Sequence, residues 1–281
     1  MKYFNVFLFV FIANWSFAQL TLEQNTPRSC PSTVQWHEER MSKDLEYKNH
    51  IERILADRVQ YMNTTTGINQ NGSCANVIVI PVAVHYDVGL VPAGSEACVE
   101  DIVNQQLASL NADFASTNAD VSNWSSYASC FDTSPGETCI EFCLATQNHP
   151  TGWGLNEGDP AITFGDTRFN WPNDIFGGDP LPANSDWAGY MNIFIQSGTG
   201  VLGISDGIPG NFSGTGVVVE ACNFGGSETG PPVTCTGVNS GDSCGGIYDE
   251  GRTLTHEIGH YLGLFHIWGD NATCNGGQDG V

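Results

Sequence analysis

Residues 253–268 read T-L-T-H-E-I-G-H-Y-L-G-L-F-H-I-W, and the predicted fold is built around this stretch. His256 and His260 are four residues apart, so on a helix they lie on one face, one turn apart. Two imidazoles in this arrangement can bind one metal ion while the helix stays regular. Glu257 follows the first histidine, where a carboxylate can hold and deprotonate a metal-bound water. The stretch therefore predicts a helix that carries a metal site.

Gly263 is expected to end this helix, because glycine readily adopts the positive φ of a helix C-terminus. His266 then supplies a third nitrogen, and three neutral imidazoles plus one water form the open tetrahedral site of a catalytic zinc. The competing interpretation is a buried amphipathic helix with incidental histidines and an apolar face of Leu254, Ile258, Tyr261 and Leu262. All the spacings together would arise by chance on the order of once in ten thousand. The pattern favours zinc.

The pattern H-E-x-x-H-x-x-G-x-x-H is the metzincin signature. The longer stretch 253–270 resembles the pappalysin family, and especially its cytophagalysin-like bacterial members. Weaker similarities occur at I-P-V-A-V-H-Y (80–86), L-N-A-D-F (110–114), I-E-F-C-L-A (140–145) and G-V-V-V-E (216–220). The resemblance implies an α/β (α+β) metzincin-like catalytic domain, with a mixed twisted sheet, a backing helix and an active-site helix.

The resemblance also implies a secreted zinc-dependent endopeptidase that acts on protein or peptide substrates. His256, His260 and His266 would bind Zn²⁺, and Glu257 would be the general base for a zinc-bound water. One alternative is a catalytically inactive zinc-binding or matrix-associated binding protein. Another is a thermolysin-like enzyme with a downstream Glu as third ligand, although G-D-N-A-T-C-N-G-G at 269–277 does not read as a helix.

Metzincins continue beyond the zinc motif to a methionine-containing turn beneath the metal and a C-terminal helix. None of the four methionines follows His266: they are Met1, Met41, Met62 and Met191. We therefore expect a catalytic domain, residues 73–281, that is truncated after the zinc-binding motif and lacks its C-terminal subdomain. Asp270 and Asp279 resemble part of a family calcium site, which adds Ca²⁺ as a second candidate metal.

Residues 1–18 have the features of a secretory signal peptide, removed after Ala18. Lys2 gives a positive start, residues 6–13 are apolar, and Ser-Phe-Ala precedes Gln19. The apolar run is shorter than the ~20 residues that a membrane-spanning helix needs. We expect a secreted, extracellular protein.

Residues 19–72 are expected to form a prosegment and linker. Residues 34–59 predict one long charged helix, and 63–73 have linker composition. His37 and Glu38 imitate the start of a zinc motif, but position 41 is Met, so a solvated helical face is expected. Cys30, in R-S-C-P, resembles the prosegment cysteine that caps the zinc in this family; a disulfide to the rest of the protein is an equally good interpretation.

Ten cysteines in 281 residues favour an oxidising compartment. Two groups are close in sequence, and bridges are expected mainly within and near them: Cys130, Cys139 and Cys143, and Cys222, Cys235 and Cys244. The net charge is −22, and only two basic residues, Arg168 and Arg252, follow Arg58. Such an acidic chain is unsuited to binding nucleic acid or anionic membranes.

The remaining pattern predicts alternating strands and helices. Buried strands are expected at 77–84, 140–145, 190–196 and 216–221, and a helix with an apolar stripe follows Ser95. His85 is expected to be a packed core residue. The segments 150–186 and 198–216 read as loops. By resemblance, the strand at 216–221 would form the upper rim of the cleft, where an extended substrate adds as a further strand.

Overall fold

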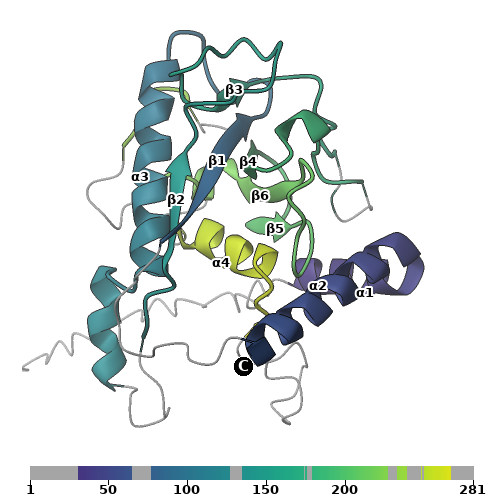
Figure 1. The fold of residues 1–281 in the computed structure, drawn as a ribbon. Coiled ribbons are helices and arrows are strands. Elements are labelled where there is room, and N and C mark those ends of the chain that lie inside the picture. Colours follow the sequence, from purple (N-terminus) through teal and green to yellow (C-terminus); the bar gives the residue numbers. More distant parts are fainter. Residues whose placement is uncertain are drawn as a thin grey trace, which may run out of the picture.

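A six-stranded mixed sheet forms the centre of the fold, as Figure 1 shows. The computed structural model describes residues 31–64, 77–126, 135–173, 175, 179–226, 233–238, 248 and 250–266. The predicted signal peptide, Cys30, Asp270 and Asp279 lie outside these residues. The elements in chain order are α1 (Pro31–Lys43), α2 (Leu45–Thr64), β1 (Ile78–Tyr86), α3 (Glu96–Phe114), η1 (Ala119–Ser126), β2 (Ile140–Leu144), β3 (Ile162–Phe164), η3 (Ser185–Trp187), β4 (Met191–Gln196), β5 (Gly203–Ser205), β6 (Gly216–Glu220), η4 (Ala221–Asn223) and α4 (Arg252–Tyr261).

The strand order is β2-β1-β4-β6-β5, and β3 extends the sheet beside the end of β1. All pairs are parallel except β5–β6, in which Ile204 lies opposite Val218. Central parallel strands are covered on both faces and are therefore nearly continuously apolar. All six residues of β4 are buried, in agreement with this rule. The predicted mixed sheet is confirmed.

One face of the sheet is covered by α3 and α4, which lie next to each other in Figure 1. The apolar stripe predicted for α3 is buried in this layer: Val99, Ile102, Val103, Leu107, Leu110 and Phe114. Ser95 precedes the helix as predicted, but its side chain makes no capping hydrogen bond. The predicted backing helix is therefore confirmed.

The other face of the sheet is covered mainly by aromatic side chains from residues 153–194, against which Trp36 of α1 also packs. Trp153, Phe169, Trp187 and Phe194 are buried there, and the last three contact the ring of His85, which is fully buried. The prediction that His85 is a core residue is confirmed. The loop at 150–186 thus supplies a second hydrophobic core and also contains the short strand β3.

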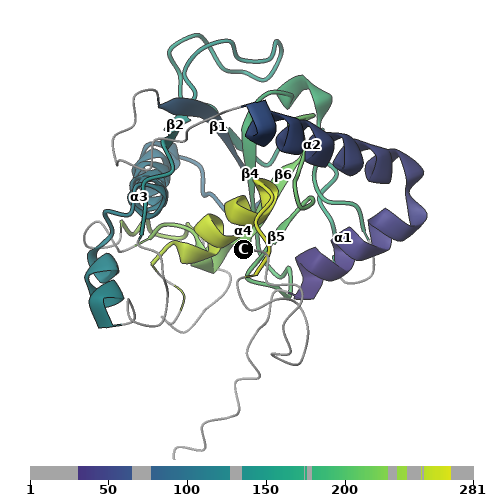
Figure 2. The same ribbon diagram turned by 60° about the horizontal axis from the view of Figure 1, so that its bottom comes forward.

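The single helix predicted at 34–59 is wrong, because the structure has two helices that meet at Asp44. The Oδ1 atom of Asp44 accepts a hydrogen bond of 2.9 Å from the backbone N–H of Tyr47, so Asp44 caps the N-terminus of α2. The two helices lie on the side of the molecule where β5 and α4 meet (Figure 2).

The edge of the sheet also differs from the prediction. The segment 198–216, expected to be a loop, contains β5, which pairs with β6 and forms the edge beside α4. The expected rim strand at 216–221 is therefore an inner strand. The three-residue sequence G-I-S carries no strand signal of its own, so pairing with β6 creates this edge.

The disulfides correct a further expectation. Cys98 at the start of α3 is bonded to Cys235, which is far from it in sequence, and not to a cysteine near 235. Cys139 and Cys222 are also disulfide-bonded, while Cys143 is a free thiol. Within the described residues, the helices are all too short or too polar to cross a membrane.

Candidate metal centre

The helix α4 is held in place by its apolar face. Leu254, Ile258 and Tyr261 are almost fully buried against the sheet and α3. This is the apolar face that the sequence predicts, and it coexists with the histidines on another face of the helix. Their packing fixes the rotation of α4 about its axis, and so fixes the directions of His256 and His260.

Gly263 terminates the helix α4 as predicted, with a φ of 97°. The N–H of Gly263 donates to the carbonyl of His260, and the N–H of Leu264 donates to the carbonyl of Gly259. This pair of hydrogen bonds is the Schellman motif, in which the chain reverses after a left-handed residue. The reversal brings His266 back beside the helix.

The structure brings together the three histidines singled out in the sequence. The Nε2 atom of His256 lies 3.1 Å from that of His260 and 3.3 Å from that of His266. Three nitrogens bound to one tetrahedral zinc at ~2.1 Å would be ~3.4 Å apart. The observed separations are close to this value, so the cluster fits a zinc ion in size.

The protonation of the cluster also suits a metal. The Nδ1 atom of His260 lies 2.7 Å from the carbonyl oxygen of Leu264, and it must donate because the carbonyl can only accept. In the neutral form of this ring the lone pair is therefore on Nε2, the atom that faces His256. Desolvation by the surrounding protein lowers the pKa of His256 to about 4 even though the residue is exposed on one side, and His260 and His266 contribute less, so this imidazole is neutral at pH 7.

Glu257 is buried, with 2% of its surface exposed. It lies on α4 next to His256 and packs against Gly203 of β5. This contact with the edge strand was not predicted, because residues 203–205 show no strand pattern.

The N-terminal helices contact the surroundings of the cluster. The ring of His37 on α1 lies 5.9 Å from the ring of Phe265, the residue before His266. His37 is 8% exposed and its Nδ1 atom is 2.9 Å from the hydroxyl of Tyr47, so the expected solvated position for His37 is wrong. Tyr47 is hydrogen-bonded to the backbone of Ile208, just beyond β5. The contacts with Phe265 and Ile208 were not visible in the sequence, because they join segments about 160–230 residues apart.

No protein-family model matches the chain. Over 89 residues it is 34% identical to an extracellular metalloprotease of Arthroderma benhamiae, covering 30% of this chain and 28% of that protein. Another extracellular metalloprotease of the same fungus is 54% identical over 37 residues, 12% of this chain and 13% of that protein. These matches span less than a third of the curated relatives' length.

Among solved structures, a Tannerella forsythia promirolysin variant matches 86% of this chain and 72% of its own, with a TM-score of 0.55 and 24% identity. This likeness establishes the fold. The chain thus has a fold similar to that of promirolysin, and part of its sequence is similar to extracellular metalloproteases.

Proposed function

We propose that the protein is a secreted zinc-dependent endopeptidase of the metzincin type, related to the pappalysins. The observation that carries the proposal is the convergence of three Nε2 atoms at separations that suit zinc, with the His260 ring oriented by the carbonyl of Leu264. The partial similarity to extracellular metalloproteases supports a proteolytic activity.

His256, His260 and His266 are the residues that would hold Zn²⁺. Bound there, the ion would lower the pKa of a water towards ~7 and polarise the peptide carbonyl. The helix α4 supplies two of the nitrogens at a fixed spacing, and the Schellman turn supplies the third. His260 and His266 are buried, at 2% and 5% exposure, whereas His256 is exposed, so the cluster is open to solvent on the His256 side.

Glu257 would act as the general base and then as the general acid. Its carboxylate would take the proton of the attacking water and pass it to the leaving amine. Its near-complete burial beside the edge strand restricts the side chain to a small volume. A base held in this way loses little orientational freedom when the substrate reacts.

We further propose that residues 19–72 are a prosegment and that the catalytic domain begins near residue 73. The contacts of α1 and α2 with Phe265 and with residues 206–208 support this, because a segment docked there would hinder access to the cluster. Capping of the metal by Cys30 and a calcium site at Asp270 and Asp279 stay predictions, as does the signal peptide at 1–18.

Metal dependence tests the proposed activity directly. Purified protein should bind zinc at this site and cleave an unfolded protein such as casein. A chelator such as 1,10-phenanthroline should abolish cleavage, and added Zn²⁺ should restore it. A protein that binds zinc with high affinity but cleaves nothing, after the N-terminal helices have been removed, would instead be the inactive zinc-binding protein.

A further inference from the structure

Gly203 in the edge strand β5 lies directly against Glu257. A Cβ atom added at Gly203 would be 2.7 Å from Cγ of Glu257, 3.0 Å from Cγ2 of Thr253 and 3.2 Å from the carbonyl oxygen of Val218. Real Cβ atoms essentially never approach other atoms within 3.0 Å. The side chain of Glu257 therefore occupies the space that any other residue at 203 would fill.

The glycine is required here for space and not for backbone conformation. Gly203 is absent from the glycines with positive φ, so an alanine could adopt its backbone angles without strain. Gly210 is close to α4 in the same way, because a Cβ atom at position 210 would overlap the ring of Tyr261. The segment 203–210, which runs along α4, thus has glycines where side chains of the helix approach its backbone.

The edge strand cannot easily move away from Glu257. Gly203 is paired with Val219 in the sheet, and the N–H of Glu220 donates to the carbonyl of Leu202 over 2.9 Å. The buried carboxylate of Glu220 also accepts hydrogen bonds of 2.9 Å from the backbone N–H groups of Gly198 and Thr199. The segment that leads into β5, residues 198–202, is therefore hydrogen-bonded to β6. A Cβ atom at position 203 would consequently displace the side chain of Glu257 rather than the strand.

We propose that Gly203 is a positioning residue for Glu257: the absence of a side chain at 203 sets where the carboxylate of Glu257 lies. This inference rests on the proposed function, in which Glu257 is the general base. A methyl group at 203 would force Cγ of Glu257 to shift by several tenths of an ångström or to change rotamer. A displacement of about 1 Å at a reacting group can cost on the order of 10²-fold in rate.

The first test is Gly203→Ala with Gly136→Ala as the matched control, since a Cβ at Gly136 meets no atom within 4 Å. We expect kcat of Gly203→Ala to fall, by up to about 10²-fold, with KM and zinc affinity nearly unchanged, because the zinc-binding atoms are on other side chains. The control should retain the wild-type kcat. An unchanged kcat in Gly203→Ala, or a loss confined to KM, would overturn the proposal.

The second test uses the melting temperature of the metal-free protein and does not depend on activity. Gly203→Ala should lower the melting temperature when Glu257 is present. It should lower it less in a Glu257→Ala background, where the clashing Cγ is gone and only the contacts with Thr253 and Val218 remain. If Gly203→Ala alone fails to fold, the double variant should fold. An equal loss in both backgrounds would show that Glu257 is not the residue that needs the space, and would overturn the proposal. A wild-type protein that binds zinc but cleaves nothing would refute the proposed function. The melting temperatures would then still show whether Gly203 makes room for Glu257.

Discussion

Arg40 on α1 donates a hydrogen bond of 3.0 Å to Oδ1 of Asp206, the residue that follows the edge strand β5. The Asp206 side chain is 8% exposed and that of Arg40 29% exposed. Burial raises the pKa of the Asp206 carboxyl, and the guanidinium of Arg40 opposes this rise. This pair ties the N-terminal helices to the segment that runs along α4.

Arg40→Met should loosen the N-terminal helices, because it leaves the buried carboxylate of Asp206 without its cation. We expect a cost of about 1–3 kcal/mol, less than for a fully buried pair because Arg40 is partly exposed. Limited proteolysis of α1 and α2 should become correspondingly faster. Lys43→Met, which removes an exposed pair with Glu39, is the control and should change little. Equal proteolysis rates in the two variants would contradict the assigned role.

The pH dependence of stability should carry a contribution from His85. Desolvation lowers its pKa to about 3, although hydrogen bonding to Asn192 opposes this, and the ring is neutral in the folded protein. The unfolded chain has a histidine pKa near ~6.5 and binds a proton first, so stability falls as pH drops from about 6.5 towards 3.

Between pH 7 and pH 5 this contribution amounts to a loss of about 2 kcal/mol in the free energy of unfolding. Urea unfolding of the wild type and of His85→Gln at both pH values measures it. Glutamine can still hydrogen-bond Thr163 and Asn192 but does not titrate. The variant should therefore lose about 2 kcal/mol less on acidification, and parallel losses in the two proteins would show that His85 is not the group responsible.

The helix that carries the histidines was predictable because its determinants are local. The four-residue spacing of His256 and His260 needs only helical geometry, and Gly263 needs only the backbone freedom of glycine to form the Schellman turn. The same holds for the alternating strands and the stripe on α3, where hydrophobic periodicity reports burial directly.

The features that the sequence did not predict depend on contacts between distant segments. The strand β5 forms only against β6, and the Cys98–Cys235 bond joins residues 137 positions apart. The break at Asp44 is the exception, because a local capping hydrogen bond from the N–H of Tyr47 accounts for it. The burial of His37 arises where α1 packs against Phe265. A periodicity argument sees a segment alone and misses such pairings.

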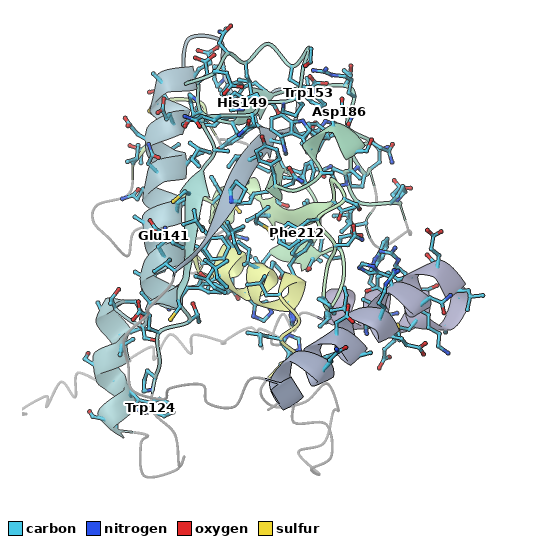
Figure 3. The ribbon with its side chains drawn as sticks, in the orientation of Figure 1. Trp124, Glu141, His149, Trp153, Asp186 and Phe212 are labelled. Carbon is cyan, nitrogen blue, oxygen red and sulfur yellow. A yellow bond between two sulfur atoms is a disulfide. The ribbon has the colours of Figure 1, made fainter. Side chains whose placement is uncertain are left out.

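If His266 is a direct zinc ligand as proposed, His266→Ala should weaken zinc binding by more than the ~10–100-fold that is typical of losing an outer-shell partner. Competition with a chromophoric chelator measures the affinity. His149→Ala is the control, since Figure 3 places His149 at the opposite end of the sheet from α4. Full zinc affinity in His266→Ala would favour the thermolysin-like ligand set with a downstream Glu.

Cys30→Ala should speed conversion of the precursor to a shorter, active form if the Cys30 thiolate caps the metal. A time course of cleavage by gel electrophoresis follows the conversion. Cys143→Ala, which removes a thiol that is free in the structure, should convert at the wild-type rate. Detection of Cys30 in a disulfide of the secreted precursor would rule this form of latency out.

The most direct test of the central claim is the rate at which Glu257→Gln cleaves an unfolded protein, measured together with its zinc content. Glutamine keeps the size of the side chain but cannot take a proton, and general acid–base catalysis typically contributes about 10²–10⁴-fold. We predict zinc binding equal to that of the wild type and a loss of at least this size in kcat. Wild-type cleavage by the zinc-loaded variant would contradict the account, because Glu257 could then not be the general base.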